Sequence, residues 1–139
     1  MEAVRVVAVA VLDRLPDGLR VVAARRTRPA EAAGCWELPG GKCRAQESLE
    51  QAAVRELEEE LGCTVRVTGR LPGVADLGGG LTLEAVTATV VAGEPLPTEH
   101  DALRRLGADE LDDVEWLPAD RVFLEGLRAV LAAGGTVAP

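Results

Sequence analysis

The 139-residue chain has few aromatic side chains, with two Trp, one Phe and no Tyr. Stacking partners for a planar ligand are therefore scarce, since a single Trp is more often a core residue than a stacking platform. His100 is the only histidine. Catalytic schemes built on a Ser-His-Asp or Cys-His pair consequently have little to work with.

The sequence also lacks a cysteine framework and a long apolar run. Cys35, Cys43 and Cys63 are odd in number and carry no C-x-x-C spacing, which disfavours both a disulfide framework and a zinc site. No apolar run reaches membrane-spanning length, and residues 1–3 do not begin a signal peptide. We therefore expect a cytoplasmic protein without a membrane partner.

Basic charge is in deficit, with a formal net charge of −8 at pH 7. This deficit argues against binding of a nucleic-acid polymer, whose phosphate backbone attracts basic patches. An acidic protein can still bind a polyphosphate if metal ions and a few Arg side chains mediate the contact. With 47% hydrophobic and 27% charged residues, residues 1–139 are expected to form one globular domain with a frayed tail at 134–139.

Patterns of apolar residues predict seven strands and two helices. The strands are expected at residues 4–12, 19–25, 36–38, 64–67, 74–77, 81–91 and 102–106, the last at an edge. The helices are expected at 49–61 and 118–132, with a helical turn at 108–111. Core candidates in the second helix are Val122, Leu124, Leu127, Val130 and Leu131. Strands interrupted by two helices predict an α/β fold with a mixed sheet and a helix on each face.

The first helix has clear start and stop signals. Ser48 and Gln51 form a capping box, and Gly62 supplies a left-handed stop. A buried stripe at intervals of three and four is predicted for Leu49, Ala52, Ala53, Leu57 and Leu61.

Three carboxylates share a different face of this helix. Glu56, Glu59 and Glu60 stand at i, i+3 and i+4. Like charges at this spacing each cost about 0.2–0.5 kcal/mol in an isolated helix. A cation between them turns this repulsion into binding, and Mg²⁺ prefers such oxygen ligands. The alternative is an ordinary solvated acidic face.

The spacing G-x5-E-x7-R-E-U-x-E-E-x-G-U, where U is a bulky apolar residue, spans residues 41–63. It resembles the Nudix box, and the segment 36–62 is similar to MutT-type Nudix hydrolases. Further matching pieces are Arg25-Arg26, Glu99-His100 and residues 117–121. The order of the pieces looks most like the CTP pyrophosphohydrolase branch, with 8-oxo-dGTP diphosphatases as close relatives. The resemblance implies the Nudix fold, an α/β/α sandwich.

The resemblance also implies a reaction and its residues. The reaction is hydrolysis of a nucleoside triphosphate to the monophosphate and pyrophosphate, with water attacking the β-phosphorus and Mg²⁺, or Mn²⁺ as a substitute, as cofactor. The positions that match catalytic residues are Glu56 as general base, Glu59 and Arg55. The positions that match metal ligands are the Gly41 carbonyl and the side chains of Glu56, Glu59, Glu60 and Glu99.

Other positions are expected to support the site. Gly40 lets the backbone approach metal and phosphate closely, Glu47 is expected to pair with Arg55 and orient the glutamates, and Gly62 ends the helix. The alternative for the Glu47–Arg55 pair is a surface ion pair of little worth. The expected substrate contacts are Arg26 on phosphate, Lys42, Leu38 and Asp120. Leu38 stands where relatives often place Phe, which widens the base pocket.

Asp120 carries the argument about the base. The matching position in purine-selective MutT enzymes is typically Asn, which offers both donor and acceptor. An ionised Asp only accepts, which suits the exocyclic amino group of cytosine, whereas a neutral Asp can also donate to N3. The alternative is that Asp120 merely caps the final helix.

Several readings of the function therefore remain open. The first is a pyrophosphohydrolase for CTP, dCTP or 5-methyl-dCTP, and the second is the same chemistry on 8-oxo-dGTP. A third is hydrolysis of another diphosphate-linked substrate such as ADP-ribose, and a fourth is a non-catalytic nucleotide sensor. The sequence leaves a homodimer open.

Overall fold

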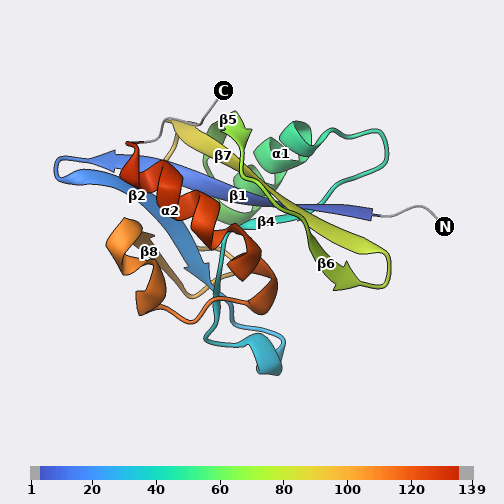
Figure 1. Cartoon of the computed structure of the whole chain (residues 1–139). Coiled ribbons are helices and arrows are strands. Elements are labelled where there is room, and N and C mark those ends of the chain that lie inside the picture. The colour runs from blue at the N-terminus through green and yellow to red at the C-terminus, as the bar shows by residue number, and fades with distance from the viewer. Residues whose placement is uncertain (1–3, 135–139) are drawn as a thin grey trace.

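The computed structural model of the chain describes residues 4–134. The expected frayed tail lies outside the described residues except for Gly134. The elements in chain order (Figure 1) are β1 (Val4–Leu15), β2 (Gly18–Arg25), η1 (Ala30–Ala32), β3 (Trp36–Glu37), β4 (Gly40–Lys42), α1 (Leu49–Leu61), β5 (Thr64–Arg70), β6 (Ala75–Gly78), β7 (Leu81–Ala92), β8 (Ala102–Leu106), η2 (Ala108–Asp113), η3 (Pro118–Phe123) and α2 (Leu124–Ala132), where η marks a 3-10 helix.

The strands form one mixed sheet. Its centre is a parallel pair in which residues 4–11 of β1 run beside residues 81–88 of β7. β7 also pairs antiparallel with β5 and β6. The later part of β1 pairs antiparallel with β2, which in turn pairs with β3 and with the edge strand β8. The predicted mixed sheet and its edge strand are confirmed.

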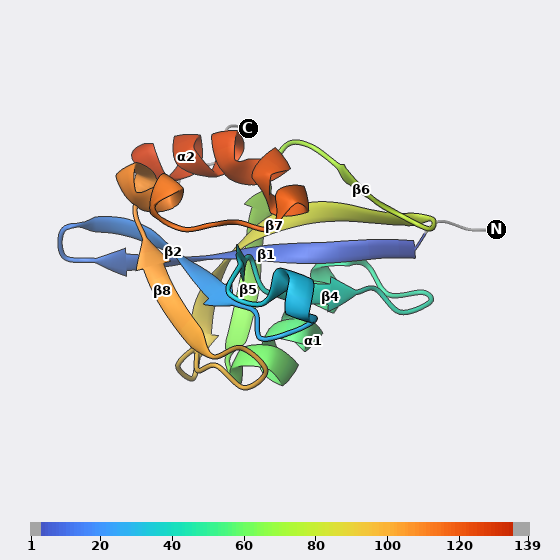
Figure 2. The ribbon, with the colours of Figure 1, turned by 90° about the horizontal axis from the view of Figure 1, so that it is seen from below.

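Helices cover both faces of the sheet, as predicted. Figure 2 shows α2 on one face and α1 on the opposite face. Because side chains of a strand alternate between faces, Val7, Val9 and Val11 of β1 join the core under α1, while Ala8 and Ala10 join the core under α2. Both faces of β1 are therefore buried, which is why its sequence is a near-continuous apolar run.

The predicted helix at 49–61 is confirmed together with its signals. Both hydrogen bonds of the capping box are present, with the Ser48 side chain accepting from Gln51 and the Gln51 side chain accepting from the backbone of Ser48. Gly62 ends the helix in the left-handed conformation at φ 68°. The predicted apolar stripe is buried in full: Leu49, Ala52, Ala53, Leu57 and Leu61.

The prediction of one continuous helix over residues 118–132 is wrong. Residues Pro118–Phe123 form the 3-10 helix η3, and α2 begins only at Leu124. A 3-10 turn holds fewer residues than an α turn, so the buried face shifts in phase. As a result the predicted core residue Val122 is 46% exposed, and Phe123 is buried in its place.

The segment after β3 also differs from the prediction. The strand expected at 36–38 covers only Trp36 and Glu37, and the glycines that follow begin a second short strand, β4. β4 pairs with residues 6–8 of β1. This pairing brings the backbone of Gly40 and Gly41 beside α1, whose packing against β4 builds the candidate site.

Candidate active site

The two glycines of β4 are required by space. A Cβ on Gly40 would overlap the carbonyl oxygen of Val7, and a Cβ on Gly41 would overlap the carboxylate of Glu56. Gly41 therefore leaves room for a carboxylate directly against the backbone, and the Glu56 carboxylate occupies this space beside β4.

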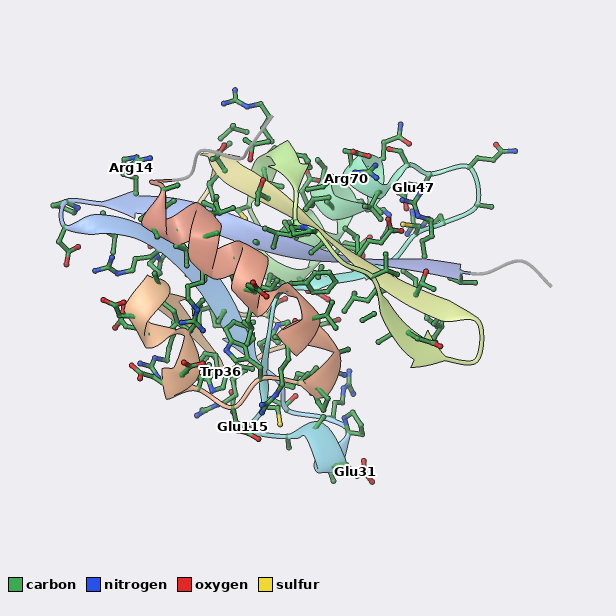
Figure 3. All side chains as sticks on the ribbon, in the orientation of Figure 1. Arg14, Glu31, Trp36, Glu47, Arg70 and Glu115 are labelled. Atoms are coloured by element: carbon green, nitrogen blue, oxygen red, sulfur yellow. The ribbon has the colours of Figure 1, made fainter. Side chains whose placement is uncertain are left out.

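Arg55 is the centre of an ion-pair network in front of α1. Its Nε and Nη2 donate to the two carboxylate oxygens of Glu47, each over 2.8 Å. Nη2 also donates to the carbonyl of Lys42 over 2.9 Å, and Nη1 donates to Glu56 Oε1 over 2.9 Å. The expected Glu47–Arg55 pair is thus present and bidentate, and it holds the loop before α1 against the helix. Figure 3 shows Glu47 next to α1. The hydrogen bond from Arg55, aided by the Arg44 backbone N–H, lowers the pKa of Glu47 to about 2.

The three glutamates of α1 occupy different surroundings. Glu56 is mostly buried and paired with Arg55, whereas Glu59 is about half exposed and lies 3.5 Å from Arg55 Nη1. Glu60 turns toward β4, where its Oε2 accepts from the Gly40 N–H over 3.1 Å. Burial raises the pKa of Glu60 to about 7, against the opposing effects of His100 and of the Gly40 N–H.

These donors fit a hard divalent cation. Glu56, Glu60 and the Gly41 carbonyl supply oxygen atoms only, the ligand type that Mg²⁺ takes. The cradle at Gly41 keeps the Glu56 carboxylate against the backbone. Among residues 4–134, no three His, Cys, Asp or Glu side chains already stand in a metal-holding group.

A small polar cleft lies beside Glu60. There the Arg26 Nη1 donates to Glu37 Oε1 over 3.1 Å, and His100 Nε2 lies 2.8 Å from Glu37 Oε2. The expected Glu99 lies in its wall. The lining residues are Arg26, Thr27, Arg28, Glu37, Glu60, Glu99 and His100.

A second cavity of about 220 Å³ adjoins this cleft, because Arg26, Glu37 and Glu60 line both. Apart from these three side chains, it is lined by apolar residues, two glycines and one carboxyl group, that of Asp120. The remaining lining residues are Val6, Val7, Ala8, Leu38, Gly40, Gly41, Leu77, Leu83, Leu117 and Ala119.

Asp120 is only 4% exposed. Its Oδ2 accepts a hydrogen bond from the backbone N–H of Leu38 over 2.8 Å. Burial raises the pKa of Asp120 to about 7, although the Leu38 N–H opposes this shift. The alternative that Asp120 caps the final helix is wrong, because Asp120 lies inside η3 and neither η3 nor α2 has a side-chain cap.

The structure brings some of the residues that the sequence singled out together at the second cavity, and others lie outside both cavities. Arg26, Leu38 and Asp120 meet the glycines and Glu60 at the second cavity. Five other predicted residues with charged side chains line neither the polar cleft nor the second cavity: Lys42, Glu47, Arg55, Glu56 and Glu59.

Sequence reasoning missed Glu37. This residue accepts from Arg26 and contacts His100 at the junction of the two cavities. A signal was available, because a charged residue between Trp36 and Leu38 in a short apolar strand needs a polar partner inside the fold.

The α/β/α fold and the carboxylates beside the glycine strand β4 are typical of one class of hydrolase, and comparison with known proteins shows the family. The NUDIX domain family matches residues 4–133. A Mycobacterium tuberculosis protein named "Putative 8-oxo-dGTP diphosphatase 2" is 44% identical over 117 residues, covering 82% of this chain and 83% of its own. An Escherichia coli protein named CTP pyrophosphohydrolase is 35% identical over 135 residues, or 96% of this chain and 97% of its own. The solution structure of the E. coli ORF135 protein superposes with a TM-score of 0.79 at 32% identity, covering 96% of this chain and 94% of that one.

The chain belongs to the NUDIX family, and it is a Nudix pyrophosphohydrolase. Enzymes of this family generally need a divalent metal. None of the helices among residues 4–134 is long and apolar enough to cross a membrane.

Proposed function

We propose that this enzyme hydrolyses nucleoside triphosphates to the monophosphate and pyrophosphate with Mg²⁺, and that it favours cytidine nucleotides such as CTP, dCTP and 5-methyl-dCTP. The observation that carries this proposal is the position of Asp120. Its carboxyl lines the same cavity as Arg26, Gly41 and Glu60. A nucleotide with its base at Asp120 then has its phosphates beside the glutamates of α1.

The metal-binding end follows from the oxygen donors. The residues that would hold Mg²⁺ are Glu56, Glu59, Glu60 and Glu99 through their carboxylates and Gly41 through its carbonyl. When bound, the metal would neutralise charge on the phosphates and activate the attacking water. Arg55 holds the Glu56 carboxylate in place, and Glu56 is proposed to take the proton of that water.

The base-reading end follows from the chemistry of Asp120. Cytosine presents an exocyclic amino donor, and its N3 is an acceptor in the free base. With a pKa of about 7, Asp120 accepts from the amino group when ionised and donates to N3 when neutral. Leu38 and Leu83 give the base an apolar surface in place of an aromatic platform.

A second substrate, 8-oxo-dGTP, is favoured by the same pKa. A neutral Asp120 presents a donor and an acceptor, as the amide of Asn does in purine-selective enzymes. The mycobacterial relative is named for this activity.

The test is pyrophosphate release with Mg²⁺ across CTP, dCTP, 5-methyl-dCTP, 8-oxo-dGTP, the ordinary triphosphates and ADP-ribose. The highest kcat/KM is expected for a cytidine nucleotide. A maximum for 8-oxo-dGTP would keep the reaction and reject the cytidine assignment. Asp120→Asn is expected to lower the ratio of kcat/KM for CTP to that for 8-oxo-dGTP, and an unchanged ratio would show that Asp120 does not read the base.

A further inference from the structure

His100 is held by one hydrogen bond in the polar cleft. Its side chain is 5% exposed, and its Nε2 lies 2.8 Å from Glu37 Oε2. Because a carboxylate only accepts, Nε2 carries the hydrogen. The other ring nitrogen, Nδ1, is buried and has no hydrogen-bond partner among the described residues. An unpaired buried polar atom opposes folding, and the contact with Glu37 is the one side-chain hydrogen bond of this ring within residues 4–134.

Glu37 passes this contact on to Arg26. The second carboxylate oxygen, Oε1, accepts from Arg26 Nη1 over 3.1 Å, and Arg26 Nε donates to the carbonyl of Arg28 over 3.0 Å. Two of the three guanidinium nitrogens are thereby fixed. Nη2 of Arg26 makes no hydrogen bond within residues 4–134 and is free to bind a ligand.

Arg26 stands at the junction between the two cavities. It lines the cavity that contains Asp120 and also the polar cleft that contains Glu99, with Glu60 common to both. In the proposed function, the base lies at Asp120 and the metal at the glutamates. Because Arg26 lines both cavities together with Glu60, its guanidinium is within reach of the phosphate chain that joins them.

We propose that His100 is a positioning residue that acts through Glu37 to hold the Arg26 guanidinium where it binds phosphate oxygens of the substrate. This inference rests on the proposed function for the identity of the substrate. A planar guanidinium binds phosphate well only when its orientation is correct. Without His100, the Glu37 carboxylate loses one of its two anchors, and Arg26 loses its fixed orientation.

The kinetic test uses His100→Leu, which cannot donate, and His100→Gln, whose amide N–H can still reach Glu37. His100→Leu is expected to raise the KM for CTP about tenfold with kcat within about threefold, since substrate binding is lost and not the chemical step. His100→Gln is expected to keep most of the wild-type KM. A fall in kcat at constant KM for His100→Leu would overturn the proposal, as would an equal rise in KM for both variants.

A double-mutant cycle tests whether His100 acts through Arg26. Arg26→Gln alone is expected to raise KM as much as His100→Leu or more, and the double variant should be no worse than Arg26→Gln. Independent effects that multiply in the double variant would overturn the proposal. Asp101→Asn is the matched control: it breaks the neighbouring pair with Arg25, which is exposed, and it should leave KM unchanged.

Binding of inorganic tripolyphosphate with Mg²⁺, measured by calorimetry, separates this proposal from the choice of nucleotide. Wild type is expected to bind, His100→Leu and Arg26→Gln to bind about tenfold more weakly, and the double variant to be no weaker than Arg26→Gln. Equal binding by wild type and His100→Leu, or no binding by wild type, would overturn the positioning role even if CTP is hydrolysed. The expected binding pattern without hydrolysis of any nucleotide would reject the proposed function and support the role of His100.

Discussion

The backbone N–H of Leu38 donates to Oδ2 of Asp120 over 2.8 Å, across 82 residues of sequence. This bond joins the end of β3 to η3 and places a buried carboxyl in the wall of the second cavity. Because burial raises the pKa of Asp120 to about 7, its charge changes within the neutral pH range. The contribution of Asp120 to the free energy of unfolding therefore depends on pH.

Asp120→Asn is expected to stabilise the fold at alkaline pH. Between the ordinary pKa of Asp near 3.8 and about 7, the native protein keeps a proton that the unfolded chain has lost, so wild-type stability falls as pH rises through this window. Asn does not ionise, so the variant does not lose stability in this way. The free energy of unfolding of the variant should equal that of wild type at pH 4 and exceed it by something on the order of 2–4 kcal/mol at pH 8.

Urea denaturation at pH 4 and pH 8 measures this difference. The control is Asp109→Asn, which changes an exposed carboxyl in η2 and should shift stability little at either pH. An Asp120→Asn variant that is no more stable than wild type at pH 8 would show that Asp120 is not held against its charge.

Glu56→Gln is expected to lower kcat by about 10²–10⁴-fold, because the amide cannot take a proton from water. The variant should fold normally, since the amide oxygen still accepts from Arg55. Steady-state kinetics with a thermal melt of the same sample checks both parts. Glu58→Gln is the matched control, because Glu58 lies on the exposed side of the same helix, and it should retain full turnover. Full turnover in Glu56→Gln would remove Glu56 from the chemistry.

Glu47→Gln is expected to act on the glutamates through Arg55. The loss of one charged partner weakens the bidentate pair, and Arg55 then holds Glu56 less firmly. Changes around metal ligands of this kind typically cost about 10–100-fold in metal affinity or activity. The concentration of Mg²⁺ that gives half-maximal rate should therefore rise in the variant. Restoration of the wild-type rate by excess Mg²⁺ is expected if metal binding is what is lost, and an unchanged Mg²⁺ dependence would contradict this role.

Much of the fold could be predicted because its signals are local. The capping box at Ser48, the stop at Gly62 and the apolar stripe of α1 act within one element, and all of them are present. The split at Phe123 could not be predicted, because apolar spacing over so few residues fits a 3-10 turn followed by an α-helix as well as one helix. The strand β4 forms because it pairs with β1. The sequence of two glycines and a lysine has no strand pattern of its own, so this strand could not be predicted.

The candidate site divides in the same way. Arg26, Leu38 and Asp120 lie far apart in sequence, and only the resemblance to a family pointed to them together. The bond between Leu38 and Asp120 could not be predicted, because it uses a backbone N–H that every residue except proline has. The role of Glu37 depends on His100, which arrives from the loop before β8, and tertiary contacts of this kind are absent from sequence spacing.

Leu38→Phe separates the shape of the second cavity from the chemistry of Asp120. Leu38 is 4% exposed and lines the cavity, whereas its hydrogen bond to Asp120 uses the backbone and survives the change. The larger side chain narrows the space for a purine more than for a pyrimidine. We expect kcat/KM for 8-oxo-dGTP to fall about tenfold more than kcat/KM for CTP, because a difference of about one methylene group in an apolar pocket discriminates on this scale.

Overpacking by the Phe side chain is also expected to lower the free energy of unfolding by about 1–3 kcal/mol, so a thermal melt is recorded in parallel. Leu38→Met conserves volume and should keep the wild-type ratio. An equal loss for both nucleotides in Leu38→Phe would show that the base binds elsewhere, because a cavity that holds the base must respond to its own width.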